Sequence, residues 1–123
     1  MQRARFERLV AQALDTLPPQ FARRLTNIAV MVEPRPSREV ARDLGADILG
    51  LYQGASEMEQ SPMAPYELPE VIVIYQDNIE AVCRTDAEII DEIRKTVIHE
   101  VGHHFGLTDD QMEAWEENGP DDG

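Results

Sequence analysis

Residues 99–109 read HEVGHHFGLTD, and the interpretation of the whole chain starts from this stretch. His99 and His103 stand four residues apart. On an α-helix such residues lie about 40° apart in projection and one turn apart along the axis, so both imidazoles can reach one ion. Glu100 is displaced by about 100° from His99, which keeps it off the ion but near a water bound to it. The stretch therefore predicts a metal site with Glu100 as a general base.

The preceding residues predict a helix long enough to hold this site. Thr85 and Glu88 form a capping box, and Asp86 adds a negative charge to the first turn, so we expect the helix to begin near Asp86. His99 and His103 lie outside its apolar stripe, which predicts a cleft at the edge of the core. The stripe is formed by Ile89, Ile90, Ile93, Val97, Ile98, Val101 and Phe105.

The residues after the helix predict a third ligand. Gly106 ends the helix, because glycine readily takes the left-handed conformation at a C-cap, and the sharp return brings Asp109 to the metal. A catalytic zinc needs three protein ligands and an open position for water, and Asp109 is the natural third. His104, by contrast, projects into the apolar stripe, and we interpret it as a packed core histidine rather than a ligand.

These residues resemble the H-E-x-x-H mark of the zincin metallopeptidases. More narrowly, they resemble the H-E-x-x-H-x-x-G-x-x-[H/D] group, and the form with Asp in last place is similar to snapalysin-like and small bacterial zincin-like peptidases. The resemblance covers the last third of the chain. It implies a zinc-dependent metallopeptidase with Glu100 as the catalytic residue and one zinc ion on His99, His103 and Asp109. The larger metzincins place a methionine in a tight turn under the metal, whereas Met112 follows the third ligand closely and is expected to be ordinary packing.

Length and composition predict one minimal domain over residues 1–123. The hydrophobic content is 42%, and no apolar run approaches the roughly 20 residues of a membrane span. No signal peptide is visible, and the single Cys83 cannot form an intrachain disulfide, so we expect a cytoplasmic protein.

Charge is divided unequally along the chain. Residues 1–45 carry eight arginines and five acids, for +3, and residues 46–123 carry three basic residues and nineteen acids, for −16, which sums to the net −13. This acidic balance repels nucleic acid and anionic membranes, so neither is expected as a partner. It would favour basic, extended peptide or protein substrates.

The hydrophobic pattern predicts a zincin-like α+β domain, with a small mixed or antiparallel sheet packed against the metal-binding helix. A covering helix is expected over 6–17 and a second, short one from Pro19. The other expected elements are a strand over 28–32 buried on both faces, a short helix within 37–47, a strand over 48–52, a loop over 55–69, a central strand over 71–75, and short helices over 78–84 and 111–117. The resemblance implies that the 48–52 strand binds substrate. Gly50 within it indicates a close backbone approach, either of another strand or of a bound peptide, and close packing is the favoured interpretation.

Two questions stay open at this stage. The electrophile that stabilises a tetrahedral intermediate could be Tyr52, Tyr66 or Tyr75. The rival function is a non-catalytic metal- or peptide-binding module with a zincin-like fold, because only about fourteen residues follow Asp109.

Overall fold

The computed structural model describes residues 1–54 and 70–117; the predicted loop over 55–69 and the tail from Asn118 lie outside these residues. No helix among the described residues is long and apolar enough to cross a membrane. The elements, in chain order, are α1 (Arg3–Asp15), α2 (Pro19–Ala22), the 3-10 helix η1 (Arg23–Leu25), β1 (Ile28–Glu33), α3 (Arg38–Leu44), β2 (Gly50–Gln53), β3 (Glu70–Tyr75), α5 (Gln76–Ala81), α6 (Asp86–His104) and α7 (Asp109–Glu117).

The three strands form a mixed sheet in the order β1-β3-β2. β1 runs parallel to β3, and β2 runs antiparallel to it with Leu51 opposite Val73. β3 is therefore central, as predicted, and β2 lies at an edge. β2 starts at Gly50, two residues later than expected. The α+β class with a small mixed sheet is confirmed.

The prediction that β1 is buried on both faces is wrong. Ile28 and Val32 are buried, but Met31 between them is 47% exposed. The reason is the position of β1 at the other edge of the sheet, where only the face toward the helices is covered. A continuous apolar run cannot distinguish such a strand from a fully buried one.

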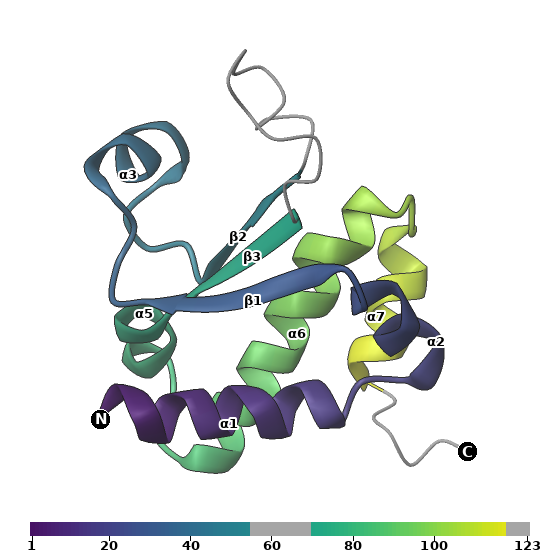
Figure 1. Ribbon diagram of the computed structural model, residues 1–123, viewed down its shortest axis with the longest axis horizontal. Helices are drawn as coiled ribbons and strands as arrows, with labels where there is room; N and C mark the ends of the chain where they lie inside the picture. The colour runs from purple at the N-terminus through teal and green to yellow at the C-terminus, as the bar shows by residue number, and fades with distance from the viewer. Residues whose placement is uncertain (55–69, 118–123) are drawn as a thin grey trace.

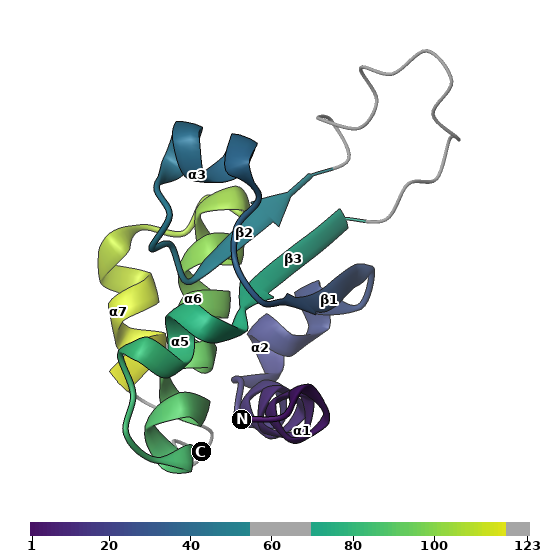
Figure 2. The ribbon, with the colours of Figure 1, turned by 90° about the vertical axis from the view of Figure 1, so that its left-hand side faces the viewer.

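Helices α1 and α6 lie on the same side of the sheet, and Figure 2 shows α6 between α7 and the strands. This layer confirms the predicted N-terminal covering helices, with Phe6 and Phe21 fully buried. The side chains that fill the space between helices and sheet belong to one continuous core. It includes Phe6, Val10, Ala13, Phe21, Ile28, Val32, Ile72, Ile74, Ile93, Val97 and Val101.

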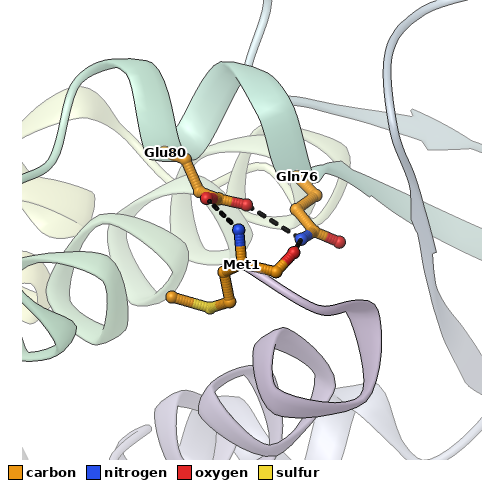
Figure 3. Close-up of polar contacts among 3 residues, drawn as sticks. All are labelled: Met1, Gln76 and Glu80. Carbon is orange, nitrogen blue, oxygen red and sulfur yellow. Dashed lines mark hydrogen bonds and ion pairs between the residues drawn. The ribbon is translucent and has the colours of Figure 1, made fainter.

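The start of α1 is fastened to α5 by polar contacts (Figure 3). The amino group of Met1 lies 3.1 Å from Glu80 Oε1. Gln76 Nε2 donates hydrogen bonds of 2.8 Å to the Met1 carbonyl and to Glu80 Oε2. These contacts fix one end of α1, so that its apolar face stays against α6.

Candidate active site

Helix α6 begins where the sequence predicts. Thr85 is its N-cap, and the Thr85 hydroxyl accepts a hydrogen bond of 3.1 Å from the backbone N–H of Glu88. The Glu88 carboxylate accepts a 2.9 Å bond from the backbone N–H of Arg84, one residue before the cap. Two backbone donors that the helix itself cannot satisfy are thus paired, and the register of the site residues is set from this end.

The two histidines of the motif lie side by side at the edge of the core. Ile98 and Val101 of the apolar stripe are fully buried, whereas His99 and His103 are exposed. The ring centroids of His99 and His103 are 4.6 Å apart in an edge-on arrangement. The predicted placement of this pair outside the stripe is therefore confirmed.

The end of α6 has the hydrogen bonds of a Schellman motif. Gly106 has φ +76°, in the left-handed region that favours glycine. The N–H of Gly106 donates to the carbonyl of His103 at 3.1 Å, and the N–H of Leu107 donates to the carbonyl of Gly102 at 3.0 Å. The chain reverses direction at this point, as predicted from Gly106.

The return leads directly into α7, which starts at Asp109 rather than at the expected residue 111. Thr108 Oγ1 accepts a 3.1 Å bond from the N–H of Gln111, and Gln111 Oε1 accepts a 2.9 Å bond from the N–H of Thr108. This reciprocal capping box holds Asp109 in the first turn, where Asp109 Oδ1 lies 3.3 Å from His103 Nε2. This second cap was not among the predicted features, although the T-x-x-Q pattern at 108–111 carries its signal.

Two contacts fasten α7 to α6. Near its start, buried Met112 packs against Gly102, where an added Cβ would lie 2.6 Å from the Met112 sulfur. At its other end, both terminal nitrogens of the buried Arg94 donate to the carbonyl of Glu116. Met112 is thus a packing residue, as expected.

The donor set of His99, His103 and Asp109 fits zinc by its chemistry, because zinc takes imidazole nitrogen and carboxylate oxygen. The structure brings these side chains together pairwise, His99 beside His103 and His103 beside Asp109. Within residues 1–54 and 70–117, no three His, Cys, Asp or Glu side chains converge on a common point that could hold an ion. A bound cation would therefore draw the three side chains together from the positions described here.

Glu100 faces strand β2 rather than open solvent. Its carboxylate accepts a hydrogen bond from the backbone N–H of Tyr52. Burial raises the pKa of Glu100, while the neighbouring His99 and His103 and the bond from Tyr52 act in the opposite direction. A carboxylate with a raised pKa is a stronger proton acceptor, which suits the predicted general base.

A cleft of about 370 Å³ adjoins these residues. One wall is the chain entering β2, from Ile48 to Gly50, and part of the opposite wall is Thr96, His99 and Glu100 of α6. The prediction of close packing at Gly50 is confirmed, because a Cβ there would lie 2.7 Å from Thr96 Cγ2 and 3.0 Å from the Val73 carbonyl.

The charged residues of the cleft are mainly acidic. Glu92 and Glu116 line it beyond Glu100, and Lys95 is the basic residue among the lining side chains. Lys95 Nζ lies 3.0 Å from Asp91 Oδ2, which offsets its charge. The side chains that line the cleft therefore carry a net negative charge.

The interpretation of His104 as a packed core residue is wrong. Its side chain is 41% exposed; the ring lies 4.4 Å from the Tyr52 ring, and Nε2 lies 3.6 Å from Glu70 Oε1. The helical wheel predicts the side of the helix from which a side chain projects. It does not predict whether another element of the fold covers that side chain. At this level of α6 the described part of the sheet ends, because Glu70 is the first residue of β3.

Of the three candidate tyrosines, the structure describes Tyr52 and Tyr75. The Tyr52 hydroxyl is buried. Tyr75 is 2% exposed, and burial raises its pKa, with a further contribution from Glu33. Tyr66 lies outside the described residues.

Comparison with known proteins identifies the family. A solved structure, a conserved hypothetical protein from Thermus thermophilus, is similar with a TM-score of 0.58 at 24% sequence identity, over 85% of this chain and 94% of that one. This likeness supports the fold alone. The comparison with curated proteins gave no match. The model of the zincin-like metallopeptidase family matches residues 25–118, which include the whole site. The chain therefore belongs to the zincin-like metallopeptidase family.

Proposed function

We propose that this protein is a zinc-dependent peptidase that hydrolyses peptide bonds, with Glu100 as the general base. The observation that carries the proposal is the position of His99 and Glu100 together on one wall of a cleft whose other wall leads into an edge strand. A reacting peptide laid along that strand would lie next to the proposed base.

The residues of the site have separate roles in this proposal. His99, His103 and Asp109 would hold one zinc ion. When bound, zinc lowers the pKa of its water toward neutrality and polarises a carbonyl oxygen. Glu100 accepts a proton from the attacking water and delivers it to the nitrogen of the leaving amine.

The substrate class follows from the edge strand and from the charge of the cleft. The N–H of Tyr75 donates to the carbonyl of Leu49, so Leu49 and Tyr75 form a hydrogen-bonded pair between the two strands. Such pairs alternate along an antiparallel ladder, so the next residue, Gly50, directs its N–H and C=O away from β3. An extended peptide can pair with these groups as an added strand. Glu92 and Glu116 would then attract Lys or Arg side chains of that peptide.

The decisive experiment combines metal analysis of the purified chain with a peptide-library digest. Wild type should bind one zinc and cleave peptides. Glu100→Gln should keep the zinc and the fold and lose cleavage by about 10²- to 10⁴-fold, because glutamine is nearly isosteric and cannot accept the proton. Asp109→Ala should weaken zinc binding strongly. Zinc binding without cleavage by wild type would instead establish a non-catalytic module.

Charge selectivity has its own test. Attraction between exposed charges is screened over a Debye length of about 8 Å at physiological ionic strength. Cleavage of basic peptides should therefore fall as salt rises, and Glu92→Gln with Glu116→Gln should reduce this salt dependence. Equal cleavage of acidic and basic peptides at every salt concentration would exclude a role for these carboxylates.

A further inference from the structure

The last turns of α6 carry two rows of polar side chains at a spacing of four residues. His99 and His103 form one row, which we call the ligand row. Thr96, Glu100 and His104 form the second, and each of its members meets β2. Residues four apart lie on one face of a helix, so the second row is a continuous contact line, which we call the strand row.

The strand row contacts β2 at successive points. Thr96 Cγ2 lies against Gly50, where only a hydrogen fits. Glu100 accepts the N–H of Tyr52, and the ring of His104 lies 4.4 Å from the ring of the same tyrosine at an interplanar angle of 36°. The hydrogen bond between Glu100 and Tyr52 thus has a packing contact on each side along α6, from Thr96 one turn before it and from His104 one turn after it.

The direction of the Tyr52 N–H follows from the pairing of β2 with β3. Because Leu49 is in a hydrogen-bonded pair with Tyr75, the amides of Leu51 and Gln53 face β3, and that of Tyr52 faces outward. It therefore takes no part in the pairing with β3, and its acceptor is the Glu100 carboxylate. Its place against α6 is set by the Tyr52 side chain, whose ring meets His104.

We infer that His104 is a positioning residue: its ring holds Tyr52 of β2 against α6 and so keeps the Tyr52 N–H on the Glu100 carboxylate. The contact of His104 Nε2 with Glu70 of β3, at 3.6 Å, orients the imidazole on the two strands and away from the ligand row. The inference rests on the proposed function only in assigning catalysis to Glu100; the structural claim stands apart from it.

Amide hydrogen exchange of the metal-free full chain, read by NMR, tests the structural claim. The Tyr52 amide should be protected in wild type and lose roughly fivefold or more of its protection in Glu100→Ala, which removes the acceptor. His104→Ala should cause a similar loss. His104→Phe should retain the protection, because it keeps an aromatic ring on Tyr52.

The variants and internal controls separate the contributions. The Leu51 amide, paired with β3, should change less than that of Tyr52 in every variant. Glu70→Gln weakens the contact between His104 Nε2 and Glu70 while the contact between the His104 and Tyr52 rings remains. It should therefore reduce the protection of the Tyr52 amide less than His104→Ala does. Wild-type protection of Tyr52 in His104→Ala, with loss in Glu100→Ala, would overturn the role of His104. Equal protection in wild type and Glu100→Ala would overturn the bond itself.

Activity and zinc binding then give a second readout. His104→Ala should bind zinc as wild type does but show a kcat lower by roughly tenfold, because the base is less well positioned, and His104→Phe should restore most of it. A loss of zinc affinity in His104→Phe would make His104 a ligand and refute the inference. A wild type with no peptidase activity would refute the proposed function, while the exchange result would still decide the position of Tyr52.

Discussion

The first half of α6 lies under α1 and the sheet, whereas its last turn lies where β2 finishes and β3 begins. Ile93 in the first half is fully buried, and His104 on the same side of the helix is 41% exposed at the last turn. One face of α6 thus packs into the core at Ile93 and makes a polar contact with the strands at His104. The difference shows that the available neighbours, and not the periodicity alone, decide what a helix face does.

The largest stability effect should come from the buried half. Ile93→Ala should lower the free energy of unfolding by about 2–5 kcal/mol, because it leaves a cavity in the fully buried core. His103→Ala, at the exposed end, should stay within about 0.5 kcal/mol. Urea denaturation of metal-free protein measures both. Equal losses would mean that the site end contributes to the core as much as the first half does.

Close packing between α6 and β2 gives the next effect. Gly50→Ala should cost about 1–3 kcal/mol, because the new methyl group meets Thr96 Cγ2 and the Val73 carbonyl. Adding Thr96→Ser removes the first obstacle and should recover part of this loss, while the backbone carbonyl remains. No cost in Gly50→Ala would show that the strand can move away from the helix without penalty. Thermal melts of the two variants are the measurement.

The turn after α6 should be less sensitive. Gly106→Ala should destabilise by about 1–2 kcal/mol through the left-handed conformation alone, since among the described residues no atom beyond the two chain neighbours lies within 4 Å of the added Cβ. Gly106→Asn should cost less, because asparagine tolerates this conformation. Thermal melts of both variants measure the difference. If they were equally unstable, a steric contact rather than backbone conformation would be responsible.

The smallest effect concerns Cys83, near the start of α6. Burial raises the pKa of its thiol, and Glu92, Glu88 and Asp91 raise it further. A raised pKa leaves less thiolate at pH 8, so alkylation by iodoacetamide should be slower than that of an unstructured cysteine peptide, with its midpoint at higher pH. Glu92→Gln should shift the midpoint back toward lower pH. A midpoint at or below that of the peptide would contradict the assigned causes.

Local signals in the sequence were enough to predict much of the site. Thr85 and Gly106 mark the ends of α6 through hydrogen bonds made within a few residues, and the i, i+4 spacing of His99 and His103 is a property of the helix itself. These features depend on nothing distant in the chain. The central position of β3 was predictable from its continuous β-branched run.

The errors arise where burial depends on distant partners. Met31 is exposed because β1 is an edge strand, and His104 is exposed because β2 and β3, as far as the structure describes them, end beside it. Neither exposure can be predicted from the residues adjacent in the sequence. The bond from Tyr52 to Glu100 joins residues 48 apart in the chain, so spacing along one helix could not reveal it.

If Asp109 binds the proposed ion, its position on a separate helix would couple ion binding to the association of α7 with α6. The hydrogen bond from Arg94 to the carbonyl of Glu116 and the packing of Met112 against Gly102 both hold α7 beside α6. An ion held by His99, His103 and Asp109 would require this associated form. Its apparent affinity would equal the intrinsic affinity multiplied by the fraction of molecules with α7 in place. Arg94, which supplies no ligand atom, would therefore help to determine the lowest metal concentration at which the protein keeps its ion.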